Sequence, residues 1–155
     1  MSKRVLLIVY HSKSGSTERM ARAVIQGAQD EELEGVAVVA KSAYQADASD
    51  LLQANAIILG TPENFGYMSG ALKDFFDRTF YEVEGKIAPL PYTVFIKAGN
   101  DGTGALNAIR RIANGYPFVE AQEPLIVKGE LTPADTEKCR VLGQTFAAAL
   151  DLGIY

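Results

Sequence analysis

Five short apolar segments recur along the chain, and the stretches between them have the periodicity of helices. Strands that are apolar at consecutive positions are buried on both faces, and the intervening helices supply the covering layers. This alternation predicts an α/β fold with a doubly wound five-stranded parallel sheet and helices on both faces. The predicted strands are residues 5–10, 36–40, 56–59, 93–96 and 125–127.

Helices are predicted after each of these strands. The strongest start signal is Thr132 followed by Pro133, because threonine caps a helix and proline fits the first helical position. Asp47 or Ser49 can cap a brief helix through residues 51–54. The other predicted helices cover residues 17–30, 72–80 and 105–114, and the last one ends near residue 150.

Composition narrows the possible classes of protein. At 155 residues the chain fits one domain over residues 1–155, and no apolar run reaches membrane-spanning length. We therefore expect a cytoplasmic protein that does not associate with membranes. A net charge of −4 with scattered Lys and Arg disfavours nucleic acid as a partner. A lone cysteine, Cys139, and a lone histidine, His11, leave too few ligands for a disulfide framework or a metal site.

The first strand runs directly into a loop of hydroxyl residues around a glycine, and then into a helix. Helix N-termini bind phosphate through free N–H groups and the positive end of the dipole, and short hydroxyls add donors. An ordinary N-cap explains one hydroxyl, but here four surround one glycine. Neither a kinase-type Gly-Lys-Ser/Thr nor a three-glycine dinucleotide fingerprint is present. The loop therefore predicts a site for a single phosphate, formed by Ser12, Ser14, Gly15, Ser16 and Thr17.

Two further loops follow the third and fourth predicted strands. Residues 61–68 place Phe65 and Tyr67 on either side of Gly66, and residues 98–102 are rich in glycine. An aromatic side chain can stack a planar ring, and backbone amides can bind its heteroatoms. Loops at the carboxyl ends of parallel strands meet in one crevice. A phosphate and a flat ring together indicate a mononucleotide.

These motifs resemble the flavodoxin-like superfamily that binds flavin mononucleotide (FMN). Residues 12–18, SKSGSTE, are similar to its phosphate loop. Residues 60–70, GTPENFGYMSG, followed by LK at 72–73 and FDR at 76–78, more closely resemble the branch of NAD(P)H-dependent FMN and quinone reductases. The resemblance covers nearly the whole chain. It implies the strand order 2-1-3-4-5, FMN as cofactor and NAD(P)H as a transient co-substrate.

The resemblance also assigns residues to the cofactor. It implies that Ser12, Ser14, Gly15, Ser16 and Thr17 hold the phosphate. It implies that electrons pass to a quinone, a flavin or another small acceptor, and that relatives often form homo-oligomers. We further hypothesise that Gly66 lets the backbone reorient near the flavin. The residues expected around the isoalloxazine are Thr61, Pro62, Glu63, Asn64, Phe65, Gly66, Tyr67, Met68, Ala98, Gly99, Asn100, Asp101 and Gly102.

Other functions remain to be weighed against the reductase. A flavodoxin-type electron carrier between redox proteins shares the fold and the cofactor, so fold alone does not separate the two. The chain has no Trp to enclose the flavin, which favours an open ring and hence a reductase. A hydrolase with Ser14 and His11 lacks the nucleophile-elbow pattern. A phospho-receiver needs acidic residues where the chain has His11-Ser12 and Gly60-Thr61. Arg78 is expected to be a solvated or paired surface charge.

Overall fold

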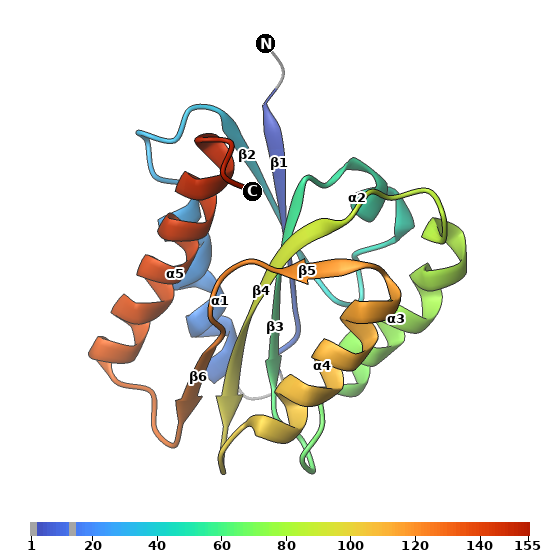
Figure 1. Cartoon of the computed structure of the whole chain (residues 1–155). Coiled ribbons are helices and arrows are strands. Elements are labelled where there is room, and N and C mark those ends of the chain that lie inside the picture. Colours follow the sequence, from blue (N-terminus) through green and yellow to red (C-terminus); the bar gives the residue numbers. More distant parts are fainter. Residues whose placement is uncertain (1–2, 13–14) are drawn as a thin grey trace.

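The computed structural model describes residues 3–12 and 15–155, which form a parallel sheet between two layers of helices (Figure 1). The strand order β2-β1-β3-β4-β5 confirms the order expected from the sequence. All strand pairs are parallel. The strands are β1 (Arg4–Tyr10), β2 (Val36–Ser42), β3 (Ala56–Pro62), β4 (Leu90–Ala98), β5 (Phe118–Glu120) and β6 (Leu125–Lys128).

The fifth position of the sheet is divided between two short strands. Residues 118–120 of β5 pair with the start of β4, and residues 125–128 of β6 pair with its end. The sequence predicted only the second of these. Because β5 has three residues, of which only Phe118 is buried, it shows no periodicity of its own. Its strand conformation comes from pairing with β4.

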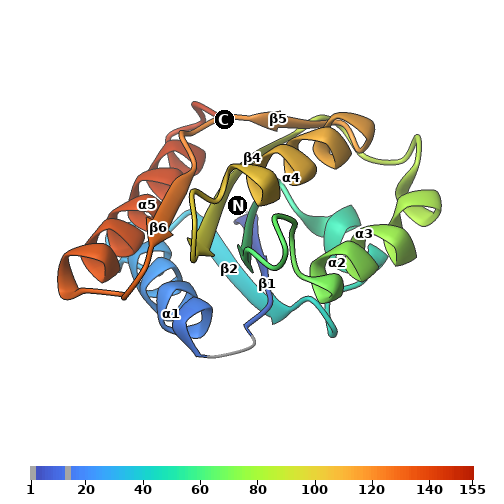
Figure 2. The same cartoon turned by 90° about the horizontal axis from the view of Figure 1, so that it is seen from below.

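Each face of the sheet carries its own layer of helices (Figures 1 and 2). Successive side chains of a strand point to opposite faces, so Leu6 and Ile8 of β1 belong to one core cluster while Leu7 and Val9 belong to the other. The first cluster is covered by α1 (Ser16–Ala28) and α5 (Pro133–Asp151). The second is covered by α2 (Ala48–Gln53), α3 (Gly70–Val83) and α4 (Thr103–Gly115).

The helices begin in two different ways. Asp47 and Thr132 form capping boxes with Asp50 and Asp135, and the hydroxyl of Ser69 accepts a hydrogen bond from the third residue of α3. Helices α1 and α4 instead follow left-handed glycines that have no side chain with which to cap them. Both of these uncapped starts lie after strands that end at the same edge of the sheet.

Helices α1 and α5 pack at unusually close range. A Cβ atom on Gly27 would overlap the carbonyl of Arg140, and one on Gly143 would overlap the carbonyl of Val24. Glycine at both crossings therefore lets the two backbones touch. This close packing joins α1 to α5 on one face of the sheet.

The carboxyl ends of β1, β3 and β4 open toward one edge, which Figure 2 views from outside. The three loops selected from the sequence all leave the sheet there. In the part of the chain that the structure describes, no helix is long and apolar enough to cross a membrane.

Candidate functional site

The loop after β1 leads into α1 through Gly15, whose φ of 92° is left-handed. Its N–H donates to the hydroxyl of Ser12 over 3.1 Å, and its carbonyl accepts from Arg19. Thr17 is buried in the first turn, and Ser16 is half-buried. The first N–H groups of α1 thus face the carboxyl edge beside hydroxyl groups, an arrangement suited to an anion. The predicted phosphate residue Ser14 lies outside the described residues.

The acidic residue of the same turn is already engaged. The hydroxyl of Tyr10 donates to Glu18 over 3.5 Å, and Arg22 forms an ion pair with the same carboxylate. Burial raises the pKa of Tyr10, and the negative charge of Glu18 raises it further. Tyr10 therefore stays protonated and keeps its donor for Glu18.

The loop after β3 contains a tight two-residue turn. Asn64 and Tyr67 exchange both backbone hydrogen bonds, at 2.9 and 3.0 Å, around Phe65 and Gly66. Positive φ angles of 52° and 71° at the two central residues match a type I′ turn. Such turns favour Asn or Gly at the position that Phe65 occupies, so a bulky aromatic there is strained. The Phe65 ring is fully exposed, and Tyr67 is 41% exposed.

Two residues of this loop lie in the interior. The buried hydroxyl of Thr61 accepts from the Ser69 N–H over 2.9 Å and donates to the Pro62 carbonyl over 2.8 Å. Met68 belongs to the core beneath α3. Thr61 therefore ties the two ends of the loop together, and both side chains shape the loop from within.

The loop after β4 exposes a different set of groups. Gly99, Asn100 and Asp101 are exposed, whereas Ala98 is buried and its carbonyl accepts from Gly129. The carboxylate of Asp101 accepts from both the N–H and the hydroxyl of Thr103, at 3.0 and 2.9 Å. These bonds lower the pKa of Asp101, the backbone N–H having the larger effect. The loop ends in the left-handed Gly102, which starts α4.

Glu63 connects these two loops. Its N–H donates to the carbonyl of Lys97, and its carboxylate accepts from the N–H of Ala105 in the first turn of α4 over 3.3 Å. Beside it, a Cβ atom on Gly104 would overlap the carbonyl oxygen of Gly66. The turn after β3 and the start of α4 lie side by side in Figures 1 and 2. The structure thus brings together the two loops expected to hold the ring.

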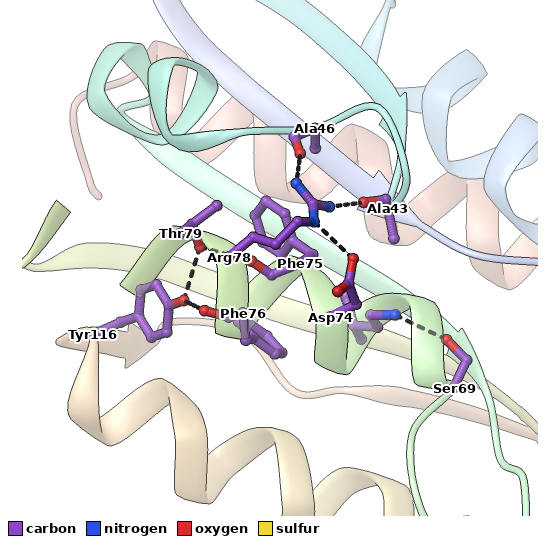
Figure 3. Close-up of polar contacts among 10 residues, drawn as sticks. Ala43, Ala46, Ser69, Asp74, Phe75, Phe76, Arg78, Thr79 and Tyr116 are labelled. Carbon is purple, nitrogen blue, oxygen red and sulfur yellow. Dashed lines mark hydrogen bonds and ion pairs between the residues drawn. The ribbon is translucent and has the colours of Figure 1, made fainter. Parts of the chain in front are cut away.

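A fourth loop, after β2, reaches the same edge and was missed by the sequence analysis. Tyr44 is 68% exposed, and its ring packs edge-on against His11 with centroids 5.4 Å apart. Arg78 of α3 holds the loop by donating to the carbonyls of Ala43 and Ala46, at 2.7 and 3.1 Å (Figure 3). Its predicted pairing is confirmed by an ion pair with Asp74. The tether to Ala43 and Ala46 has no local signal, because these residues lie 35 and 32 positions away.

The chain has one cysteine and one histidine, residue types that often bind transition metals. Within residues 3–12 and 15–155, no three His, Cys, Asp or Glu side chains are grouped to hold a metal ion. Cys139 is buried in α5, and burial raises the pKa of its thiol to about 12. The thiol therefore stays protonated and unreactive at neutral pH.

Comparisons with known proteins place this geometry in a family. The chain matches the model of the Flavodoxin family over residues 8–139. It is 35% identical over 103 residues to a flavodoxin of Aquifex aeolicus (strain VF5), covering 64% of this chain and 52% of that protein. It is 31% identical over 122 residues to NAD(P)H dehydrogenase (quinone) 3 of Rhizobium meliloti (strain 1021), covering 67% of this chain and 58% of that protein. The chain thus spans about half the length of these curated relatives.

A solved structure gives the same fold over almost the entire chain. The WrbA-like flavodoxin of Agrobacterium tumefaciens aligns with a TM-score of 0.75 and 23% identity, covering 95% of this chain and 97% of that one. At this level of identity the likeness concerns the fold. The family match extends from β1 through the first turns of α5 and includes the loops after β1, β2, β3 and β4. The chain therefore belongs to the flavodoxin family.

Proposed function

We propose that this protein binds FMN and passes electrons from NAD(P)H through it to a quinone, a flavin or another small acceptor. The observation that carries the proposal is the juxtaposition at one sheet edge of an uncapped helix start beside hydroxyl groups and a turn that presents an exposed aromatic ring. The first feature suits a phosphate, and the second suits a flat heterocycle.

The residues after β1 fit the phosphate group of FMN. Gly15 provides no side-chain cap for α1, so the first N–H groups are available to a ligand. The hydroxyls of Ser12, Ser16 and Thr17 lie in the same loop and helix turn. Glu18 is held by Tyr10 and Arg22, which reduces its repulsion of an incoming phosphate.

The residues after β3 and β4 fit the ring. Phe65 and Tyr67 expose aromatic surface, while Gly99 and Asn100 expose backbone groups able to bond heteroatoms. When bound, FMN supplies the redox chemistry, taking electrons from a nicotinamide and releasing them to an acceptor. The chain's own part is to orient the ring and to exclude water from its covered face.

Two observations favour a reductase over an electron carrier: the name of a relative and the exposure of the Phe65 ring. The Rhizobium meliloti relative bears the name of an NAD(P)H quinone dehydrogenase. Because Phe65 is fully exposed with respect to residues 3–12 and 15–155, we infer that a second planar molecule can reach this side of the site. The rings of nicotinamides and quinones are both planar.

An electron carrier is the second candidate. It is supported by the similarity to the flavodoxin of Aquifex aeolicus, which is 35% identical over 103 residues. A carrier needs the same FMN site, but its electrons come from a protein partner instead of NAD(P)H.

An anaerobic titration separates the two candidates. The FMN-reconstituted protein is titrated with NADPH and, separately, with NADH while the flavin absorbance is followed. Rapid bleaching by either nucleotide supports the reductase. A flavin that stays oxidised until a partner reductase is added supports the carrier. A protein that does not bind FMN excludes both.

A further inference from the structure

The turn formed by Asn64, Phe65, Gly66 and Tyr67 is strained yet has little internal support. Its central Phe65 has a φ of 52°, which bulky side chains rarely adopt. The ring of Phe65 is fully exposed, so packing against this chain does not offset that strain. Within the turn, the conformation is closed by the two hydrogen bonds between Asn64 and Tyr67. A strained, exposed residue persists only where its surroundings hold it.

The start of α4 supplies that support from outside the turn. The carboxylate of Glu63, the residue before the turn, accepts from the N–H of Ala105, and a negative charge is favourable at this end of a helix. Gly104 presents bare backbone to the Gly66 carbonyl, where any side chain would collide. The hydrogen bond of Glu63 draws the turn toward α4, and the lack of a side chain on Gly104 leaves room for the turn to come close.

We propose that Glu63 is a positioning residue: it fastens the turn to α4 and so makes the two ring-binding loops one rigid wall that presents Phe65. The inference rests on the proposed function, because it names how that same site is held in shape. Glu63 acts through the turn and not as a ligand of the ring. Its carboxylate accepts a hydrogen bond from the first turn of α4.

The carboxylates of Glu63 and Asp101 both accept hydrogen bonds near the start of α4, but their partners differ in distance along the chain. Asp101 bonds Thr103 two residues further along, within its own loop. Glu63 bonds a residue 42 positions away. Of these two carboxylates, Glu63 is the one that joins the two loops, so its loss is expected to loosen them from each other.

Amide hydrogen exchange of the FMN-free protein tests the proposal without reference to activity. Glu63→Ala is compared with wild type, with Glu63→Gln and with the charge control Glu130→Gln on the exposed loop after β6. We expect the Asn64 and Tyr67 amides to exchange about tenfold faster in Glu63→Ala, the scale of one lost hydrogen bond to a charged group. Glu63→Gln keeps an acceptor and gives a smaller increase, and Glu130→Gln gives none.

A second measurement follows the bound cofactor. In Glu63→Ala we expect FMN binding about tenfold weaker and a shifted reduction potential of the bound flavin, from the same lost contact. Gly104→Ala, which displaces the turn from the other side, gives the same direction of change. The double variant shows less than the sum of the two effects, because both substitutions disturb the same packing of the turn against α4.

Three results would overturn the proposal. The first is unchanged exchange at Asn64 and Tyr67 in Glu63→Ala. The second is weaker FMN binding without faster exchange, which would make Glu63 a direct ligand of the ring. The third is full additivity of the two substitutions. If the wild-type protein does not bind FMN, the proposed function fails, while the exchange data still decide the role of Glu63. If Gly104→Ala does not fold, the Glu63→Ala and Glu63→Gln pair carries the test.

Discussion

Helices α1 and α4 both begin after a left-handed glycine, with φ angles of 92° at Gly15 and 75° at Gly102, and neither glycine can supply a side-chain cap. At α4 the carboxylates of Glu63 and Asp101 accept from the first turn. At α1, among the residues that the structure describes, the loop contributes the neutral hydroxyl of Ser12. At α4 this start of a helix is joined to a carboxylate from another loop, whereas at α1 it is where we propose that the phosphate binds.

The largest expected effect, on FMN affinity, comes from placing a carboxylate beside the start of α1, as Glu63 and Asp101 are placed beside the start of α4. In Ser12→Asp, the new charge takes the place of the hydroxyl that accepts from Gly15. We expect FMN affinity to fall about 100-fold or more through repulsion of the phosphate, roughly 2.7 kcal/mol. Fluorescence titration of the FMN-free protein measures this.

Riboflavin, which lacks the phosphate, is the matched ligand for that experiment. Its affinity for Ser12→Asp should remain close to the wild-type value. Equal losses for both ligands would mean that the substitution had distorted the loop, and that the phosphate does not lie at α1.

The second effect concerns the C-terminal end of α4, where Tyr116 attaches this helix to α3. Tyr116, which follows the last turn of α4, donates to the Phe76 carbonyl, and its hydroxyl lies 2.8 Å from that of Thr79 (Figure 3). Burial raises the pKa of Tyr116 to about 12. A raised folded-state pKa contributes stability that is present below pH 10 and is lost as pH rises toward about 12. The loss is roughly 2–3 kcal/mol over this window.

Tyr116→Phe removes this titration. We expect it to destabilise the protein by about 1 kcal/mol at neutral pH through the lost hydrogen bond, with FMN affinity unchanged. Urea unfolding from neutral to alkaline pH should show the two curves converging above pH 10. Parallel curves throughout that range would show that Tyr116 does not titrate as its burial implies.

A smaller effect compares two left-handed glycines. Gly15 lies at the start of α1, and Gly85 follows α3, with φ angles of 92° and 73°. A Cβ atom meets nothing within 4 Å at either position. Replacement by Ala should therefore destabilise both variants by about 1 kcal/mol, through backbone strain alone. Only Gly15→Ala should weaken FMN binding, and equal affinities in the two variants would count against a phosphate site at α1.

The smallest effect concerns Asp101, which is exposed. Its pKa is lowered chiefly by the N–H of Thr103, so its contribution to stability is present above the unfolded-state pKa and lost as pH falls through the folded-state pKa. Asp101→Asn should be less stable than wild type at neutral pH, and this difference should shrink on acidification. Thermal unfolding at several pH values provides the measurement. A pH-independent difference would contradict a role for the charge at α4.

Much of the molecule was predictable because its signals are local. The apolar runs of β1 and β3 are buried on both faces, and Asp47 and Thr132 cap their helices through residues three positions away. The proposed phosphate loop rests on the same kind of local signal, because its hydroxyls and its glycine are adjacent in the chain. The short β5 and the exposed Tyr44 have no such local pattern, so the sequence did not predict them.

The sequence by itself determined the α/β fold, the order of its elements and the three loops that meet at the carboxyl edge, because hydrophobic periodicity and turn chemistry act between near neighbours. Only the tertiary structure decided what those loops do to one another. It placed Glu63 at the start of α4, bare Gly104 against Gly66, and Arg78 on the loop after β2. These contacts join residues tens of positions apart, and they form only when folding brings the carboxyl ends of the strands together.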